Sequence, residues 1–388
     1  MSNRRLGFYF ISLIAISHAF GKINITNEND FNNLYNISAV ISTNIAMTTS
    51  RTIDESVTLE FVDQGKFTVS TGTTITINGT VLAPLLNIFN GNGNIQFTSI
   101  SRTEKVFPQW WGAIAGTDIP YTINDSSFNN AFNSMAPGMQ MFIPQGTYLI
   151  SHLECKTPGI SITGGGTLKE VANGVALSLL ASGIHVNGLA FDGTAATIGD
   201  GHNNIINIQA NPADTTSNGK RCIIENITIT GSRSNGIDIQ ASPSNIIKNN
   251  KIYNVNDNGI VIHEVGADSN IIEGNIVSGT AVQNCIFITT TTTDTPPTDS
   301  VVGNIISNNI VTKCGDSPIE SGRHAFGTRI TGNYVEVNKA AGILIRDGKN
   351  VVVNANVVKL LNGALNDGIA VVQHSEAYNW KCKSIISQ

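Results

Sequence analysis

A short strand motif recurs along the second half of the chain, and it constrains the fold more than any other feature. In each copy a small residue precedes two branched apolar residues separated by one position; the copies start at Gly236, Gly259, Cys285, Gly342 and Gly368, with a weaker one at Ser317. A second apolar motif follows most copies and ends in asparagine, at Asn250, Asn275, Asn309, Asn333 and Asn356. These asparagines are 25, 34, 24 and 23 residues apart. The period is too short for a strand-helix-strand unit and is typical of a solenoid, so we predict an all-β fold, a single-stranded parallel β-helix.

The composition agrees with this fold and excludes one class of partner. Of 388 residues 41% are hydrophobic and only 13% are charged, which suits stacked strands joined by tight turns. The net charge is −5 and no basic stripe is present, so nucleic acid is not expected as a partner.

The five cysteines have no metal-binding spacing and are odd in number, so at least one thiol stays unpaired within a monomer and at most one disulfide is expected.

Residues 1–19 have the character of a secretory signal peptide. Arg4 and Arg5 precede an apolar run over 6–16, and Ser17-His18-Ala19 offers a small-residue cleavage site. We therefore expect a secreted, periplasmic or cell-surface protein, with an uncleaved membrane anchor as the alternative. The apolar run is too short for a stable membrane span, and no later stretch is long enough.

The rest of the chain divides into two parts. Residues 20–105 are expected to form a β-rich segment of irregular first coils, and residues 106–388 the β-helix domain. Within the second part, Asn124-Asp125-Ser126 is expected to cap a short helix that ends at Pro137-Gly138. The apolar face of this helix consists of Phe128, Ala131, Phe132 and Met135. We expect it to cover the open end of the solenoid, where unpaired strand edges would invite aggregation. Two insertions interrupt the repeat: residues 193–220 are expected to contain a strand at 205–208 and a polar loop, and residues 289–299 an exposed loop.

A resemblance to a known superfamily rests on three consecutive features. The block Trp110-Trp111-Gly112-Ala113, a short helix, and the strand Pro144-Gln145-Gly146-Thr147 lead into the repeats. This arrangement resembles the pectate-lyase-like superfamily, and within it the rhamnogalacturonase/epimerase-like and tailspike-like proteins. The resemblance implies a right-handed β-helix, in line with the handedness of parallel crossovers, and a polysaccharide partner. It leaves lyase, hydrolase, epimerase and non-catalytic binding functions open, and by analogy with tailspikes it leaves a homotrimer open.

Strand alternation predicts which repeat residues point outward. If the branched apolar residues face inward, the residue between them and the residue after them face outward. The first outward column reads Asn207, Asp238, Val261, Phe287, Glu320, Leu344 and Ala370, and the second reads Gln209, Gln240, His263, Thr289, Ser321, Arg346 and Val372. Glu264, Arg323, His324, Asp347 and His374 follow at strand ends. This face is the candidate site: His263, Glu320, Arg323, His324 and Arg346 are predicted as catalytic residues, and Asp238, Gln240, Glu264, Phe287 and Asp347 as substrate-binding residues.

The leading hypothesis is a lyase or an epimerase that acts on a uronate-containing polysaccharide. Such chemistry needs a base for the proton beside the carboxylate, and cations or calcium for the charge that develops. The histidines offer the base and the arginines the cations. Oxygen ligands for calcium would come from Asp238, Glu264 and Glu320, and calcium is left open as a cofactor.

A glycoside hydrolase is the weaker catalytic alternative. It needs two carboxyl groups about 5–9.5 Å apart, whereas Asp238 and Glu320 would lie three coils, or about 14 Å, apart. The adjacent-coil pairs Asp238 with Glu264 and Glu320 with Asp347 remain open. Of the acids in polygalacturonase-like motifs, the chain keeps only Asp257.

A non-catalytic, glycan-binding or adhesive β-helix is the alternative from another class. Catalysis predicts that the five catalytic candidates converge on one sugar, whereas adhesion predicts that they are scattered. Two other features are expected to be structural. The asparagine series should form an internal hydrogen-bonded ladder, and Trp110 and Trp111 should pack the helix rather than stack on sugars.

Overall fold

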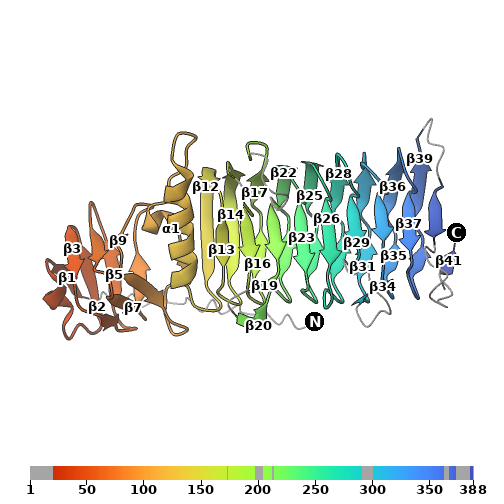
Figure 1. Ribbon diagram of the computed structural model, residues 1–388. Helices are drawn as coiled ribbons and strands as arrows, with labels where there is room; N and C mark the ends of the chain where they lie inside the picture. Colours follow the sequence, from red (N-terminus) through yellow and green to blue (C-terminus); the bar gives the residue numbers. More distant parts are fainter. Residues whose placement is uncertain are drawn as a thin grey trace, which may run out of the picture.

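The computed structural model describes residues 21–172, 174–196, 204–211, 214–290, 300–361, 367–372 and 385–387. The expected signal peptide, His374, Cys382 and most of the 289–299 insertion lie outside these residues. The described chain is a rod in which two stacks of β-coils lie in line, with one helix between them (Figure 1). Within this part of the chain, no helix is long and apolar enough to cross a lipid bilayer.

The N-terminal coils form a solenoid of their own with three parallel sheets. One sheet contains β1 (Gly21–Ile25), β2 (Ile37–Ile41), β5 (Thr58–Phe61) and β8 (Thr80–Leu82); the second contains β3 (Asn44–Met47), β6 (Lys66–Val69) and β9 (Phe89–Gly91); the third contains β4 (Arg51–Ile53), β7 (Thr74–Ile77) and β10 (Asn94–Phe97). The 3-10 helix η1 (Glu28–Phe31) follows β1. Alternate residues of these strands are buried, as strand periodicity predicts. These coils are therefore more regular than the irregular segment that we expected.

A helical junction connects this solenoid to the larger one. It contains η2 (Pro108–Trp111) and α1 (Tyr121–Ser134), and α1 lies between the two stacks in Figure 1. The predicted apolar face is buried. The predicted cap is wrong, because the helix begins after Pro120 with no side-chain cap. Asn124 instead accepts a hydrogen bond from the N–H of Ile114 and donates one to the carbonyl of Leu149. The helix covers the end of the larger solenoid as expected, and the smaller solenoid lies on its other side.

The larger solenoid is the predicted parallel β-helix. Its longest sheet contains β11 (Lys105–Val106), β12 (Gln140–Ile150), β14 (Ser161–Glu170), β16 (His185–Asn187), β17 (Ala190–Asp192), β21 (Ile223–Glu225), β22 (Thr228–Ser232), β24 (Ile246–Lys248), β25 (Lys251–Val255), β27 (Ile271–Glu273), β28 (Ile276–Ser278), β31 (Ile305–Ser307), β32 (Ile310–Thr312), β35 (Arg329–Thr331), β36 (Tyr334–Val337), β38 (Val352–Asn354), β39 (Val357–Leu360) and β41 (Ile385–Ser387). The remaining face contains β13 (Leu153–Cys155), β15 (Leu177–Leu179), β18 (Ile206–Ile208), β23 (Ile237–Gln240), β26 (Ile260–His263), β29 (Ile286–Ile288), β33 (Ile319–Ser321), β37 (Ile343–Arg346) and β40 (Ile369–Val372). We call this face the nine-stranded sheet.

Two small sheets lie outside these faces. The hairpin β19 (Ala210–Asn211) and β20 (Asp214–Asn218) belongs to the first insertion, and β30 (Val301–Val302) pairs with β34 (Ala325–Phe326) after the second. The strand that we expected in the first insertion is present as β18, a member of the nine-stranded sheet, and the hairpin is an addition to the expected polar loop.

The predicted asparagine ladder is present in the core. The side-chain amide of each member donates to the side-chain oxygen of the next, from Asn250 through Asn275, Asn309 and Asn333 to Asn356, over 2.9–3.0 Å. A second ladder joins Asn245, Asn270 and Asn304. A third, which borders the nine-stranded sheet, joins Asn204, Asn235, Asn258 and Asn284. These ladders pair the polar groups of the turns from one coil to the next, as burial of such groups requires.

The cysteines agree with the expectation of at most one disulfide. Cys285 and Cys314 form a disulfide that closes a sequence separation of 29 residues. Cys155 and Cys222 are free and buried. Burial raises the pKa of the Cys222 thiol to about 11 and that of Cys155 further, so both thiols are inert packing groups at neutral pH.

One acidic side chain lies in the core of the β-helix without a partner. Glu170, the last residue of β14, aligns with Ile150 and is 0% exposed. Neither of its carboxyl oxygens has a hydrogen-bond partner. Burial raises the pKa of Glu170 from 4.5 to about 8, so the neutral carboxyl predominates at neutral pH.

We expect Glu170→Met to remove a pH dependence of stability. Between the unfolded pKa of 4.5 and the folded pKa of about 8, the folded state binds more protons, so the free energy of unfolding falls as the pH rises. From about pH 5 to about pH 7 this loss is about 2–3 kcal/mol, at about 1.4 kcal/mol per pKa unit. Urea unfolding at both pH values should show the loss in the wild-type protein and not in the variant. An equal loss in both proteins would contradict the assignment to Glu170.

Candidate functional site

The first outward column of the nine-stranded sheet is as predicted. Neighbouring coils align Asn207, Asp238, Val261, Phe287, Glu320, Leu344 and Ala370 in one row. Several of these side chains are nevertheless covered. Asp238 is 7% exposed and Glu320 is 4% exposed, although both point away from the apolar core. The two carboxylates are thus partly shielded from water, which strengthens their electrostatic interactions.

The predicted second outward column agrees with the strand alignment at Gln240 and His263 but is wrong at Ser321. Gln240 aligns with His263, as predicted. Ser321, however, aligns with Ile288 and is fully buried, so it does not belong to this column. Gly322 takes the outward place, and its N–H donates to the carbonyl of Ile288. The reason is that Ser321 replaces the second branched residue of the motif, which shifted our assignment by one position.

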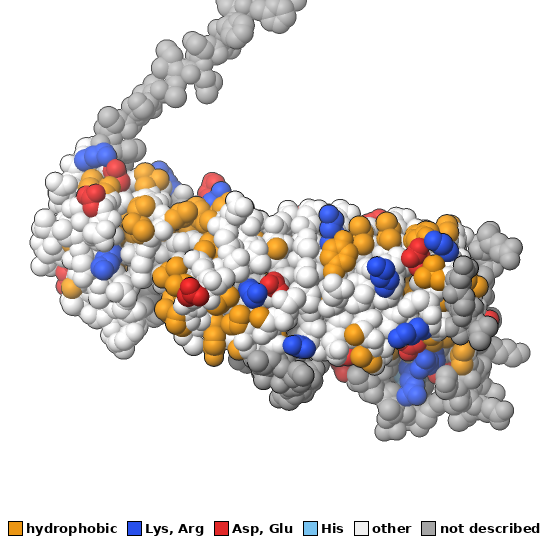
Figure 2. All heavy atoms as spheres, turned by 90° about the horizontal axis from the view of Figure 1, so that it is seen from above, with side chains coloured by type: hydrophobic (Ala, Val, Ile, Leu, Met, Phe, Trp, Pro, Cys, Tyr) orange, Lys and Arg blue, Asp and Glu red, His pale blue; other side chains and the backbone are white. Residues whose placement is uncertain are grey.

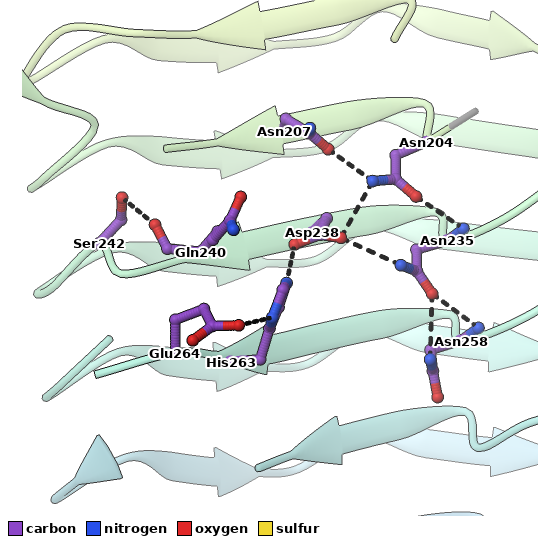
Figure 3. Close-up of polar contacts among 9 residues, drawn as sticks. All are labelled: Asn204, Asn207, Asn235, Asp238, Gln240, Ser242, Asn258, His263 and Glu264. Atoms are coloured by element: carbon purple, nitrogen blue, oxygen red, sulfur yellow. Dashed lines mark hydrogen bonds and ion pairs between the residues drawn. The ribbon is translucent and has the colours of Figure 1, made fainter. Parts of the chain in front are cut away.

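Asp238 and His263 form the centre of a polar cluster, shown in Figure 3. The Oδ1 atom of Asp238 lies 2.7 Å from Nε2 of His263 on the next coil. The Oδ2 atom accepts hydrogen bonds of 3.0 Å from the side-chain amides of Asn204 and Asn235. On its other side, Nδ1 of His263 lies 3.5 Å from Oε1 of Glu264. The imidazole therefore lies between two carboxylates.

This position favours the charged form of His263. Burial alone lowers the pKa of the imidazole, whereas its hydrogen bond to Asp238 and the charges of Asp238 and Glu264 raise it, and the pKa lies above its ordinary value. Nε2 is held by Asp238 at 2.7 Å, whereas Nδ1 lies 3.5 Å from Glu264, so Nδ1 is the nitrogen whose contact is more easily exchanged for one to a bound molecule.

We expect Asp238→Asn to lower the pKa of His263. The asparagine keeps the size of the side chain but removes the negative charge that stabilises the imidazolium. Proton NMR titration of the imidazole C–H signals measures this directly. Glu264→Gln is the matched comparison, and it should lower the pKa less because Glu264 is farther from the ring. A greater effect of Glu264→Gln would contradict this ranking.

A second cluster surrounds Glu320. Its Oε1 atom lies 3.2 Å from Nε of Arg346 on the next coil, and its Oε2 atom accepts a hydrogen bond of 2.8 Å from the side-chain amide of Asn284. The side chain of Arg346 is 34% exposed. Glu320 thus orients a guanidinium group that remains accessible from solution, and such a group binds carboxylates well.

The two clusters are separate along the rod. Asp238 and Glu320 are separated by three steps from one coil to the next, a distance of about 14 Å at about 4.8 Å per step. Val261 and Phe287 lie between them in the same column. The structure therefore brings His263, Asp238 and Glu264 together, and Glu320 and Arg346 together, but it does not join these groups around one sugar.

The remaining predicted residues lie at the edges of these clusters. Gln240 and Arg323 are exposed, and Asp347 directly follows Arg346 at the end of β37. His324 lies in the turn after β33, where Nδ1 is 3.4 Å from Oγ1 of Thr290. These residues border the site, and their roles in substrate binding or catalysis stay predictions.

The asparagines that hold the two acids were missed. Asn204, Asn235 and Asn284 donate to Asp238 or Glu320, and the third ladder connects them from coil to coil. A signal for them exists in the sequence, because an asparagine directly precedes the motif at Gly236, Gly259 and Cys285.

The described residues do not fit calcium. Both oxygens of Asp238 and Oε2 of Glu320 are already engaged with side-chain amides or an imidazole, and Oε1 of Glu320 is ion-paired with the guanidinium of Arg346. Among the residues with assigned positions, no group of three or more Asp, Glu, His or Cys side chains is arranged to hold a metal ion. A calcium ion needs six to eight oxygen ligands, and here it would have to displace cations that hold these acids in place.

A hydrolase arrangement is also not supported by the first cluster. Asp238 and Glu264 lie on opposite sides of the His263 ring, which fills the space where a glycosidic oxygen would have to bind. Asp257, the acid kept from the hydrolase motifs, accepts a hydrogen bond from Ser234.

Comparisons with known proteins found similar chains among solved structures. No protein-family model matches the chain, and no curated protein matches it. Among solved structures, the A-module of the mannuronan C-5 epimerase AlgE4 from Azotobacter vinelandii matches with 12% identity and a TM-score of 0.49, over 64% of this chain and 76% of its own. The capsular polysaccharide depolymerase gp49, a tailspike of the Acinetobacter baumannii bacteriophage Fri1, matches with 10% identity and a TM-score of 0.46, over 71% of this chain and 66% of its own. Pectate lyase Pel9A matches with 13% identity and a TM-score of 0.40, over 71% of this chain and 79% of its own.

These likenesses concern the coil architecture. The fold that the predicted resemblance implies, a parallel β-helix, is confirmed by the parallel sheets of this chain. The reaction and the substrate have to be inferred from this chain's own residues.

Proposed function

We propose that the protein acts on a uronate-containing polysaccharide as a lyase or an epimerase, with His263 as the acid–base group. The observation that carries this proposal is the position of the His263 imidazole between Asp238 and Glu264 on an outward face. A paired carboxylate fixes the orientation of the ring and raises its basicity. The three similar structures described above are named as a mannuronan epimerase, a capsular polysaccharide depolymerase and a pectate lyase, which is in line with the substrate class.

The proposed reaction begins at the carbon next to the uronate carboxylate. Nδ1 of neutral His263 takes the proton from this carbon, and the electron pair remains on the substrate. In a lyase, this pair forms a carbon–carbon double bond as the glycosidic oxygen leaves with the proton from His263. In an epimerase, the carbon instead takes up a proton from solvent on its opposite face. Arg346 binds a carboxylate on another sugar of the same polymer.

The experiment uses the purified full chain with a panel of uronate-containing polysaccharides. Absorbance of unsaturated products detects a lyase, and uptake of deuterium from heavy water at the carbon next to the carboxylate detects an epimerase. Reducing ends without unsaturated products would indicate a hydrolase. Absence of all three signals would overturn the proposal.

A non-catalytic glycan-binding function is the second candidate. It is favoured by the separation of the two clusters, since the predicted catalytic residues do not converge on one sugar. Polysaccharide binding without any of the three signals would support it.

We also propose that the protein works outside the cytoplasm, with the signal-like segment 1–19 as the support. Nucleic acid is not proposed as a partner. Figure 2 shows charged side chains scattered singly or in small groups over one face of the rod, without a basic stripe.

A further inference from the structure

A second concave site lies at the junction of the two solenoids, away from the nine-stranded sheet. It is a cleft of about 510 Å³ between α1 and the turn that joins β9 to β10. Its lining consists of Val69, Thr74, Phe89, Asn90, Gly91, Asn92, Gly93, Asn94, Ile95, Gln96, Trp111, Ser126, Asn130 and Asn133. None of these residues belongs to the Asp238 or Glu320 cluster.

Uncharged polar side chains face each other across this cleft. Asn90, Asn92, Asn94 and Gln96 are exposed on one wall, and Ser126, Asn130 and Asn133 are exposed on the other. The last three are spaced i, i+4 and i+7 along α1, so they share one face of the helix. None of these seven side chains makes a hydrogen bond to another described residue of the chain. The amides of the core ladders, in contrast, are bonded from coil to coil.

An aromatic ring contributes to the same surface. Trp110 is 2% exposed and donates its indole N–H to the carbonyl of Pro84, so it packs the junction as expected from the sequence. Trp111 is only partly buried and lines the cleft, with its ring centroid 5.1 Å from that of Phe89. The two adjacent tryptophans therefore differ in role.

Both walls of the cleft are held in place by packing. The opposite face of α1 buries Phe128 and Phe132 against the β-helix. In the turn, a Cβ atom on Gly91 would lie 2.2 Å from the carbonyl oxygen of Val69, and one on Gly93 would lie 2.4 Å from the Val69 side chain. Such close approach requires glycine and fixes the turn against β6, so the polar groups are preorganised.

The lining indicates the chemical class of the ligand. Carboxamides donate and accept hydrogen bonds, as sugar hydroxyls do, and an indole ring packs well against the apolar C–H face of a sugar. No Lys, Arg, Asp or Glu lines the cleft, so nothing in it would compensate the charge of a uronate or a phosphate. Sites for apolar ligands are lined mainly by hydrophobic side chains, which is not the case here. We propose that this cleft binds a neutral carbohydrate.

The test is calorimetric titration of the full chain with neutral oligosaccharides built from glucose, galactose, mannose or xylose. At least one of them should bind. Asn94→Ala combined with Asn133→Ala removes one amide from each wall, and we expect the dissociation constant to rise about tenfold, as the loss of two hydrogen bonds predicts. Asn24→Ala, at an exposed asparagine outside the cleft, should leave it unchanged.

A second variant blocks the cleft without depending on particular hydrogen bonds. Asn130→Arg places a long charged side chain on the exposed face of α1 and should abolish binding. His263→Gln, which bears on the proposed function, should leave this binding unchanged, so the two proposals fail independently. Failure of every neutral oligosaccharide to bind, or binding that neither cleft variant weakens, would overturn this inference.

Discussion

Replacing Asn275 with alanine is expected to lower the free energy of unfolding by about 3–7 kcal/mol. Asn275 is 0% exposed and lies in the middle of the first ladder. Its side chain accepts from the N–H and the amide of Asn250 and donates to the carbonyl of Ile247. The substitution removes the Asn275 partner of the Asn250 N–H and of the Ile247 carbonyl, at about 1–3 kcal/mol each, while the Asn250 amide keeps its bond to Ile224 and the side-chain bonds lost cost about 1 kcal/mol more.

The ladder itself provides a matched control. Asn356 makes the same kinds of bond, to Asn333 and to the carbonyl of Ile330, but it is partly exposed at the end of the described ladder. Water can replace its bonds, so Asn356→Ala should cost about 1 kcal/mol. Solenoid coils interact mainly with their neighbours, so hydrogen exchange around β27 should report local opening alongside urea unfolding. Equal costs at the two positions would contradict the importance of buried pairing.

His263→Gln is expected to lower turnover on the uronate polysaccharide by about 10²–10⁴-fold, the range for removal of a general acid–base group. Glutamine retains an amide that can donate to Asp238, so the cluster should keep its geometry. A thermal unfolding curve checks that stability is unchanged. Turnover within a factor of a few of the wild-type value would place the chemistry elsewhere.

The pH dependence of the same reaction provides an independent check. If neutral His263 takes the proton, the rate rises with pH through the pKa of the imidazole, and the raised pKa displaces this rise toward alkaline pH. Asp238→Asn, which lowers that pKa, should shift the rise to lower pH. A rate that falls with pH over this range would indicate proton donation by the imidazolium instead.

The fold was predictable because its signals are periodic. Branched apolar residues at alternate positions specify inward-facing strands, and asparagine at a fixed place specifies turns that bond to each other. The N-terminal solenoid was less predictable, because its recurring glycines, Gly65, Gly72 and Gly79, precede successive strands of different sheets and therefore do not mark the coil length.

The candidate site was predictable only in part. Alternation placed Asp238, Glu320 and His263 on the outward face, but it says nothing of how deeply an outward group is covered. Asp238 aligns with Val261 on the next coil, and His263 lies two residues beyond Val261 on the same face, so the two side chains meet diagonally across the coils. The motif at Ser317 lacks the second branched apolar residue that defines the register of the other copies. For this reason Ser321 was assigned to the outward face.

The stacking of coils at a constant spacing makes the nine-stranded sheet a molecular ruler. His263 and Arg346 lie three coils apart, at about 14 Å, because each coil adds about 4.8 Å. A glycan that runs along the rod can reach both groups only if it exceeds a minimum length, and shorter oligosaccharides reach one or the other. Insertion of a whole coil between β26 and β29 would increase that minimum length in a single step, because the contacts of His263 lie before this step and those of Glu320 and Arg346 lie after it.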